Sequence, residues 1–559
     1  MRELATLDDE LCTWPAEPRL YTRANGADQW PDPVTPLTQT AVVAPQIRSL
    51  PTTFTDVLGL IERVPVVDCA GVFYGFVAVG LEPTLRMADV MPGWSAQAVG
   101  EQYFGLPPDP DCAEPRGGGS PLQVAAVGTR VVRAMRRYPR DARAYEAENR
   151  LRWDHARALD WTTVTDSELV AELAFYAVNA PRWRVPLLVS NMIAASAYEQ
   201  LVKFATRTSG EDGPALAARA MSSIGGIHTS DAMAALGRVA DGSMTLDAWR
   251  AEYGFRGPIE YELASRPWGE NDEYLERLVE QARSRRDEHD DSDERDAAVA
   301  RAQLRADAGR RRPVLAGLLR SLEHHLRWRE NTKVPEVLGV ARLRLAAREA
   351  TRRLVDRGAI DEPDDGWFLT FDEVVADVVQ TAPPDRRDEV ARRRGVHEGA
   401  RALELPELFL AAPGSVDVVP DERIRALGLL PPAPADEPGT AGSSGLHGLG
   451  TSPGTVTAKV RVVTDPFAAD LEPGEVLVAR TTDPAWTPLF LDAAAAVIDL
   501  GGPLSHGAVI ARELGIPCVI NVKEASTRLA TGQTVTVDGA RGEVELVAGG
   551  ALAPRAAPE

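Results

Sequence analysis

The sequence predicts an α+β multidomain protein, in which a large and mainly helical domain precedes a small α/β domain. Three observations favour this class. Residues from about 120 to 415 have mainly helical periodicity, a stretch rich in Pro, Gly and Ser follows at Pro431–Gly445, and short apolar runs separated by glycine turns occupy the rest. With 559 residues, 44% hydrophobic and 26% charged, the chain is long enough for about two to four domains.

The part before the Pro-rich stretch is expected to form one large domain over residues 1–430. Its first 110 residues combine short β-rich runs, such as Val64–Val79, with proline-rich loops. Long amphipathic stretches follow at Asp166–Glu199 and Arg312–Asp356. The segment Glu270–Arg312 is dense in Glu, Asp and Arg, so we expect a solvated helical arm there and assign it no function.

The stretch PPAPADEPGTAGSSG has almost no residue that packs in a core, and it predicts a flexible linker over residues 431–447. The 15 residues of Pro431–Gly445 reach roughly 45 Å when extended, at about 3 Å each. That length allows the following domain to swing. We expect this domain, a compact α/β unit, over 448–549 and a disordered tail over 550–559.

The charge balance limits the possible partners. The chain has 61 Lys and Arg against 82 Asp and Glu, a formal net charge of −21, which disfavours binding to nucleic acid or to an anionic membrane surface. An anionic substrate must therefore be bound by local cations. The four cysteines lie far apart without metal-ligand spacing, so no metal site is indicated. No leader or spanning segment is evident, and the expected location is the cytoplasm.

The most informative stretch is VIDLGGPLSHGAVIARELGIPCVINV, residues 497–522. A buried type of strand over Ala495–Leu500 is expected to end at Gly501 and Gly502, which permit a tight backbone turn. Glycines are therefore predicted to bring the end of a strand close to the start of a helix.

Ser505 is the expected N-cap of that helix, which should run from His506 to about Leu514. His506 then lies in the first turn, where unpaired backbone N–H groups and the positive end of the helix dipole favour negative charge. A phosphoryl group carried on this imidazole would be stabilised there.

This stretch resembles the phosphohistidine, or swivelling, domain of the phosphoenolpyruvate-utilising enzymes, which include phosphoenolpyruvate synthase, pyruvate phosphate dikinase and rifampin phosphotransferase. The resemblance extends back through ARTTDPAWTPLF (Ala479–Phe490) and GLGTSPGTVTAKVRVV (Gly448–Val463). Leu504 stands where the dikinase and the synthase have Thr, which is more similar to the rifampin phosphotransferase branch. The resemblance implies that His506 carries the phosphoryl group, supported by Ser505, Gly501, Gly502 and Gly507.

Four patches of the larger domain resemble the acceptor-binding domain of rifampin phosphotransferase. They are residues 21–40, 90–108, 253–271 and the motif RENTK at 329–333. We expect no counterpart of the ATP-grasp domain of that family in this sequence, in which no GxxxxGK[ST] loop occurs. We therefore expect a separate ATP-grasp subunit to supply the phosphoryl group, a split arrangement similar to that of phenylphosphate synthase. ATP and Mg²⁺ are expected on that partner.

Arg329 and Lys333 are expected on the apolar side of a helix over Pro313–Lys333. A desolvated pair of cations can bind a phosphoryl group and stabilise the charge of its transfer. The alternative is that they snorkel or form a salt bridge at the helix end. Glu330 is a candidate to orient Lys333 or to accept a hydroxyl proton. The stripe on this helix consists of Leu315, Leu318, Leu319, Leu322 and Leu326.

Arg256 and Glu260 in FRGPIE are further candidate substrate-binding residues, although such a pair is as often a structural salt bridge. Phe255 stands where the related pattern commonly has His, so a role of that His is not carried over. Gln39 follows PVTPLT, which resembles the pocket-entry loop of the family, and is the third candidate. Four tryptophans suit a bulky apolar acceptor, yet aromatic residues are more often plain core; they are Trp183, Trp249, Trp268 and Trp328.

The expected function is that of a phosphotransferase component. An ATP-grasp partner phosphorylates His506, and the phosphoryl group passes to a hydroxyl near Arg329 and Lys333. The expected acceptor is a small organic molecule with a bulky, apolar body. Two alternatives remain open. In an ATP-dependent dehydratase the phosphate would be eliminated from the phosphorylated alcohol, and in a binding or regulatory module the fold would persist without catalysis.

Overall fold

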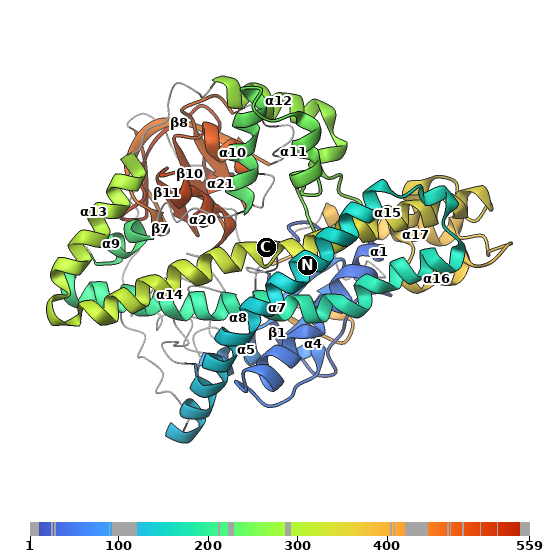
Figure 1. Cartoon of the computed structure of the whole chain (residues 1–559), viewed down its shortest axis with the longest axis horizontal. Helices are drawn as coiled ribbons and strands as arrows, with labels where there is room; N and C mark the ends of the chain where they lie inside the picture. Colours follow the sequence, from blue (N-terminus) through green and yellow to red (C-terminus); the bar gives the residue numbers. More distant parts are fainter. Residues whose placement is uncertain are drawn as a thin grey trace.

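The computed structural model describes most of the chain. The described residues are 10–23, 26, 29–88, 90–91, 120–210, 213–221, 228–284, 292–402, 405–406, 408–419, 445–464, 466, 469, 471–482, 486–502, 505–522 and 524–547. They form a large helical region with a small N-terminal sheet, followed by a separate α/β region at the C-terminal end (Figure 1). No helix in these ranges is long and apolar enough to cross a membrane.

A five-stranded antiparallel sheet joins the two ends of the helical region. Its strand order is β2-β3-β1-β4-β5. The rings of Tyr21, Phe73 and Phe409 pack against one another at its centre, with centroids 4.8 to 5.8 Å apart. Because β4 pairs with β1 and β5 pairs with β4, residues up to 419 belong to one folded unit. The strands are β1 (Arg19–Thr22), β2 (Ala70–Phe73), β3 (Phe76–Gly80), β4 (Leu408–Ala412) and β5 (Ser415–Val418).

Four long helices form the frame of this region. They are α7 (Pro121–Ala158), α8 (Asp166–Ser209), α14 (Arg312–Asn331) and α15 (Val334–Asp356). The helix α8 begins with a capping box made by Thr165 and Glu168, and it lies against both α14 and α15 (Figure 1). The main core of the region lies between α8, α15 and the segment around residues 30–43.

The shorter helices connect and cover this frame. They are α1 (Pro36–Thr38), α2 (Ala44–Ile47), α3 (Ser49–Pro51), α4 (Val66–Cys69), α5 (Leu81–Ala88), α9 (Gly213–Ala220), α10 (His228–Ala240), α11 (Leu246–Tyr253), α12 (Asp272–Ser284), α13 (Ser292–Asp307), α16 (Phe371–Val378) and α17 (Arg387–Arg401). The π-helical turns are η2 (Gln39–Val43) and η3 (Thr52–Val57). The 3₁₀ turns are η4 (Trp161–Thr163), η6 (Trp268–Glu270), η7 (Gly309–Arg311) and η8 (Pro363–Phe368).

The stretch expected as one amphipathic unit over Arg312–Asp356 is two helices, and α14 ends at Asn331, before Lys333. The expectation that Lys333 continues the helix from Pro313 is therefore wrong. Two local causes explain the break. The Thr332 hydroxyl donates to the carbonyl of Trp328 (2.7 Å), and Pro335 brings no N–H and favours the first turn of a new helix.

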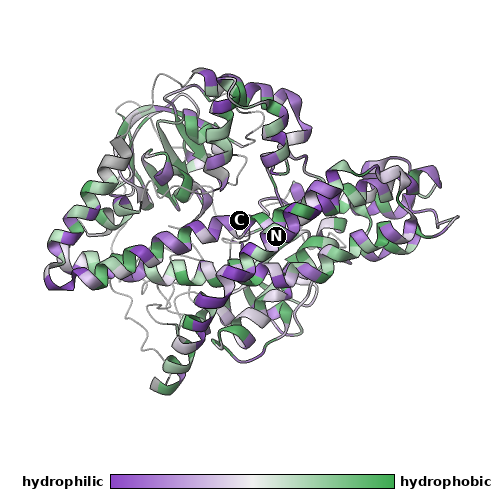
Figure 2. Ribbon diagram, viewed as in Figure 1, coloured by the Kyte–Doolittle hydropathy of each residue, from purple (hydrophilic) through white to green (hydrophobic). Residues whose placement is uncertain are grey.

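The charged segment expected as a solvated arm is packed along one side. In α12, Leu275 and Leu278 are buried against α10 and α11. In α13, Leu304 is buried in a cluster that it shares with α8, α9 and α14. Described charged residues of the same helices are exposed, as Glu276 and Arg277 of α12 and Arg305 of α13 are, and hydrophilic and hydrophobic residues alternate along α12 (Figure 2). The helix α12 of this segment also contacts the C-terminal domain, because Leu491 packs against the same apolar cluster.

The C-terminal domain contains an eight-stranded sheet of order β6-β13-β12-β8-β9-β10-β11-β7. The pairs β8-β9, β9-β10 and β10-β11 are parallel, and the outer pairs are antiparallel. The strands are β6 (Gly445–His447), β7 (Leu449–Ser452), β8 (Thr455–Val463), β9 (Val476–Ala479), β10 (Ala495–Ile498), β11 (Cys518–Ile520), β12 (Thr534–Asp538) and β13 (Glu543–Leu546). The helices are α19 (Thr487–Asp492), α20 (His506–Glu513) and α21 (Ala525–Arg528).

The predicted linker, 431–447, lies outside the described residues up to 444, and its last three residues are β6, which pairs with β13. The sheet therefore begins within the expected linker, because Leu446 is buried in the domain core. The expected tail, 550–559, also lies outside the described residues. The C-terminal sheet, orange and red in Figure 1, is framed by α9 and α13, by α10 to α12 and by α14.

Candidate functional site

The turn that leads into α20 is shaped by two glycines. Gly501 has φ of +148°, in the region that favours glycine, and a Cβ there would lie 2.9 Å from Ser505 Oγ. The Gly502 carbonyl accepts a hydrogen bond from the Ser505 N–H (2.8 Å). Ser505 has the extended backbone of an N-cap, as expected, but its side chain makes no capping bond among the described residues. Ser505 is therefore the N-cap by its backbone conformation and not by a side-chain hydrogen bond within the ranges that the structure describes.

Gly507 allows the helix α20 to lie close to Thr482 and Ile498. A Cβ at this position would lie 2.4 Å from Thr482 Oγ1 and 2.6 Å from Ile498 Cδ1. Because Ile498 is buried in β10, that space is not available to a side chain. Gly507 therefore lets the first turn of α20 sit directly on the end of β10.

His506 is 4% exposed, and it lies at the start of α20. Its Nε2 lies 3.2 Å from the hydroxyl of Thr487, in the first turn of α19, while Nδ1 has no hydrogen-bond partner in the described part of the chain. Burial is the main reason why the pKa of His506 is lowered to about 3; Glu330 opposes the shift, and Lys333, Arg256 and Arg329 add to it. The imidazole is therefore neutral at physiological pH.

The RENTK motif lies close to His506, because its residues Arg329, Glu330 and Lys333 interact electrostatically with this histidine. Lys333 Nζ donates to both carboxylate oxygens of Glu330, at 2.9 and 3.2 Å, and Arg329 Nε lies 3.7 Å from Glu330. Glu330 is 4% exposed. Its burial favours a raised pKa, but Lys333, Arg329 and His506 lower the pKa to about 2. Of the two expected roles of Glu330, orienting Lys333 fits this geometry, whereas a carboxylate of such low pKa is a poor proton acceptor.

The two domains meet through buried contacts around this cluster. Arg512, in the last turn of α20, donates to the Thr451 carbonyl (3.3 Å) and interacts electrostatically with Tyr198 of α8 and with Arg329. Leu491 of α19 packs against the apolar cluster of α10, α11 and α12, and α9 contacts β7. His506 is thus presented to the helical domain by a packed interface.

Arg256 and Glu260 form a buried ion pair in which Nε lies 2.6 Å from Oε1 and both side chains are 3% exposed. Arg256 also reaches His228, whose Nδ1 is 3.2 Å from Nη1, and it contributes to the electrostatic field at His506. His228 is linked in turn to the RENTK motif, because its backbone N–H donates to Asn331 Oδ1 (3.0 Å). The FRGPIE and RENTK segments are therefore joined next to His506.

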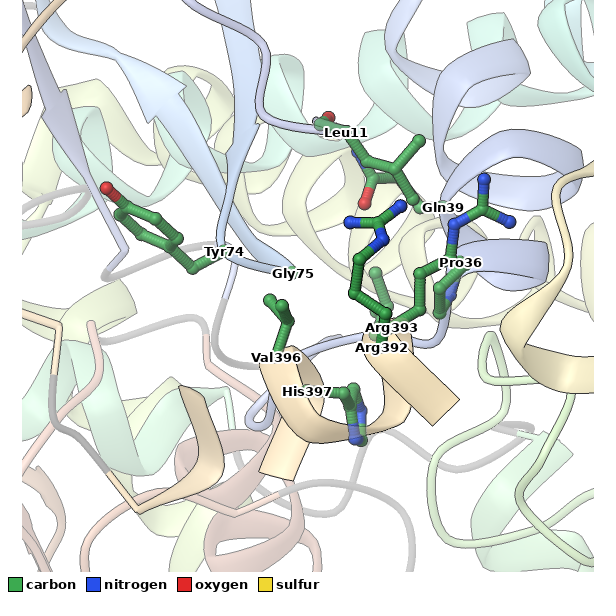
Figure 3. A pocket seen from close by; sticks show the side chains of 10 residues that line it. Leu11, Pro36, Gln39, Tyr74, Gly75, Arg392, Arg393, Val396 and His397 are labelled. Atoms are coloured by element: carbon green, nitrogen blue, oxygen red, sulfur yellow. The ribbon is translucent and has the colours of Figure 1, made fainter. Parts of the chain in front are cut away.

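Gln39 is not part of this cluster. Its Nε2 donates to the Leu11 carbonyl (2.5 Å), and it lines a separate pocket with an accessible volume of about 20 Å³ (Figure 3). Arg393 of α17 lines the same pocket and is paired there with Glu10 and with Glu373. The structure thus places Gln39 in a small recess between the N-terminal segment and α17.

Two residues of the site escaped the reasoning from sequence. Thr487 lies in the motif ARTTDPAWTPLF and was therefore open to detection, but His228 has no local signal and is found only through its contacts. Trp183, Trp249 and Trp268 are buried in the core, and Trp328 is half-buried on α14. Within the described ranges no group of three or more His, Cys, Asp and Glu side chains is arranged to hold a metal ion.

The part of the chain that contains His506 is similar to a known family. Residues 471–542 match the family model of the mobile domain of PEP-utilising enzymes. Rifampicin phosphotransferase of Streptomyces sviceus is 30% identical over 353 residues, which cover 58% of this chain and 37% of that protein. Rifampicin phosphotransferase of Bacillus subtilis is 32% identical over 201 residues, 36% of this chain and 21% of that protein.

Two relatives carry other names. An uncharacterized protein of Mycobacterium tuberculosis is 35% identical over 294 residues, which cover 53% of this chain and 30% of that protein. The prodigiosin synthesizing transferase PigC of Serratia marcescens is 50% identical over 101 residues, 18% of this chain and 11% of that protein. The chain spans little more than a third, or less, of the length of the curated relatives it matches.

Replacing Gly507 by Ala should destabilise the C-terminal domain by about 1–3 kcal/mol, because the new methyl group overlaps Thr482 and Ile498. Gly317→Ala in α14 is the matched control, since no atom lies within 4 Å of its Cβ position and Ala favours a helix by about 1 kcal/mol. Urea unfolding of both variants measures the difference. Equal stability of Gly507→Ala and the wild type would refute the close contact.

Acidification should release His506 from the helical domain. The pKa of His506 rises from about 3 when docked toward its ordinary 6.5 when released, so the released state binds the proton more strongly. Docking is unaffected above pH 6.5 and weakens by about 1.4 kcal/mol per pH unit below it.

Small-angle scattering of the full chain between pH 7.5 and 5 measures this release as an increase in the radius of gyration. His506→Asn, which cannot gain the proton, is the control and should expand less. His228 titrates in both proteins, so it does not account for a difference between them. An identical pH response of the two proteins contradicts the assigned cause.

Proposed function

The chain belongs to the PEP-utilising enzymes through its mobile domain, and from this premise we propose that it is a phosphotransferase component. It carries a phosphoryl group on His506 and passes it to a hydroxyl of a small organic acceptor. The observation that supports the proposal most is the placement of a neutral, buried imidazole from one domain beside Lys333 and Arg329 of the other.

The charges of the cluster suit a phosphoryl group. A phosphoryl group carries about −1.5 to −2 charges, and such a charge needs compensation in a site that excludes water. Lys333 and Arg329 supply two positive charges and Glu330 one negative charge. The cluster is therefore cationic overall, and its cations are held in place before the phosphoryl group arrives.

The transfer step uses the neutral ring as the leaving group. The acceptor hydroxyl loses its proton to a base, and its oxygen forms a bond to phosphorus. The bond between phosphorus and the imidazole nitrogen breaks, and the electron pair of that bond returns to the ring. Lys333 and Arg329 stabilise the negative charge on the phosphoryl oxygens during the step. A phosphorylated ring that carries a proton on its second nitrogen departs as neutral imidazole, and the low pKa of His506 keeps the ring neutral after the transfer.

The source of the phosphoryl group is proposed to be a separate ATP-grasp subunit, to which ATP and Mg²⁺ bind. In the proposed cycle the C-terminal domain leaves the helical domain, receives the phosphoryl group from that subunit and returns. The segment over 431–444 that connects the domains lies outside the described residues, and its Pro, Gly and Ser composition supports such a movement.

His506→Ala should remove the label that ³²P-phosphoramidate, a small donor that phosphorylates histidine without a kinase, places on the peptide that contains residue 506. The wild type is expected to gain a phosphate that is labile in acid and stable in base, as a phosphorus–nitrogen bond is. His447→Ala is the matched control, because His447 is an exposed histidine of the same domain. A His506→Ala chain that labels as well as the wild type, or a wild type that does not label, overturns the carrier assignment.

Lys333→Gln should leave the loading of His506 unchanged and slow the transfer by about 100-fold, since it removes a charge that acts on the transferring group. The measurement is the single-turnover loss of ³²P from the loaded chain to water and to benzyl alcohol, a small apolar acceptor. Lys459→Gln, an exposed residue of β8, is the control. Equal transfer rates of Lys333→Gln and the wild type contradict the role of Lys333.

Release of an alkene with free phosphate from an alcohol substrate would instead indicate a dehydratase.

A further inference from the structure

A second buried carboxylate lies next to the cationic cluster. Glu336, in the first turn of α15, is 0% exposed, and its Oε2 accepts hydrogen bonds from Arg184 Nη1 (2.9 Å) and from Gln46 Nε2 (3.4 Å). Its electrostatic interaction with Lys333 places it beside the RENTK motif. The chain therefore brings two carboxylates, Glu330 and Glu336, to the same lysine.

Glu336 is surrounded by aromatic rings and by the polar groups that pair with Arg184. The Arg184 guanidinium lies over the rings of Trp30 and Tyr261, at 5.8 and 5.6 Å from their centroids, and its Nη2 donates to Gln29 Oε1 (2.7 Å). Tyr176 of α8 accepts a hydrogen bond from Gln46 Nε2 (2.8 Å). Residues from α2, α8, α15 and the loop after α11 thus converge on one buried carboxylate.

This network leaves acceptors unused. Glu336 Oε1 and Gln46 Oε1 have no hydrogen-bond partner in the part of the chain that the structure describes. The Tyr261 hydroxyl lies close enough to lower the pKa of Glu336, but it makes no hydrogen bond of standard geometry there. An unpaired buried acceptor costs about 1–3 kcal/mol, and more for a charged group. A salt bridge that served structure alone would not need a vacant oxygen on its carboxylate.

The two carboxylates next to Lys333 differ in basicity. Lys333, Arg329 and His506 lower the pKa of Glu330 to about 2 against its burial. Burial raises the pKa of Glu336 above its usual value, although Arg184 and Lys333 oppose the shift. A general base works best when its pKa lies near the working pH, so Glu336 is the better proton acceptor of the two.

We propose that Glu336 binds the hydroxyl of the acceptor through its vacant Oε1 and removes its proton during phosphoryl transfer; this rests on the function proposed above. In this step the hydroxyl proton moves to Oε1, the oxygen–phosphorus bond forms, and the phosphorus–nitrogen bond to His506 breaks. A phosphorylated ring that carries a proton on its second nitrogen leaves as neutral imidazole, so charge and protons balance.

The test measures the single-turnover formation of ³²P-labelled benzyl phosphate from the phosphoramidate-loaded full chain and benzyl alcohol, from pH 5 to 9. Formation of the ester is followed because loss of ³²P to water includes the acid hydrolysis of the phosphorus–nitrogen bond. In the wild type the rate should rise with pH as Glu336 loses its proton. Glu336→Gln keeps the shape and should lower the rate at neutral pH by about 100-fold and flatten this rise. Glu336→Asp keeps a carboxylate, so it should retain the pH-dependent rise at a reduced rate.

The other groups that face Glu336 are Arg184 and Tyr176 of α8, Tyr261 and Lys333. Burial raises the pKa of both tyrosines, so they do not produce a rise in acid. The matched control is Glu349→Gln, a buried carboxylate farther along α15 that pairs with Arg352 and Arg353. It should behave like the wild type.

The outcomes separate the two proposals. A chain that takes up no label contradicts the proposed function itself. A Glu336→Gln chain that loads and then transfers at the wild-type rate with the same pH profile overturns the role of Glu336 alone. If Glu336→Gln does not fold, as judged by circular dichroism, the Asp variant decides: a wild-type rate for it overturns the proposal, because the carboxylate has been withdrawn by one methylene.

Discussion

The candidate site depends on one buried carboxylate, that of Glu330. It holds Lys333 and Arg329 within one turn of each other at the junction of α14 and α15, where the two cations would otherwise repel in a dry environment. Taking three charges out of water costs more than their attraction returns in many proteins, so such a cluster is weak evidence for a stabilising role. Its position opposite His506 gives a better reason for its presence.

The same cluster provides a direction for the movement of the C-terminal domain. A phosphorylated His506 brings negative charge to a cationic site, so the loaded domain should dock more strongly than the empty one. After transfer the neutral ring loses that attraction, and the domain is free to return to its donor. The break between α14 and α15 serves this arrangement, because it places Lys333 beyond the last turn of α14, from which its side chain folds back to Glu330.

The sequence allowed much of the C-terminal domain to be predicted, since its strands and the helix that starts at His506 follow from local apolar runs and glycine turns. The RENTK motif was found, but the helix end at Asn331 was missed, although Pro335 was a visible signal for a new first turn. His228 and Glu336 were beyond prediction, because their partners Arg256 and Arg184 are distant in sequence and only the packing of separate helices brings them together.

The central claim is that the phosphoryl group on His506 reaches Lys333. The chain has only four lysines, at 203, 333, 459 and 523, so solid-state NMR of the phosphorylated chain with ¹⁵Nζ-labelled lysine can measure the coupling between ³¹P and a single amine. The account predicts one strong ³¹P–¹⁵N coupling, at hydrogen-bond range, that disappears in Lys333→Gln. A phosphorylated chain without such a coupling, or one whose coupling persists in that variant, would contradict it.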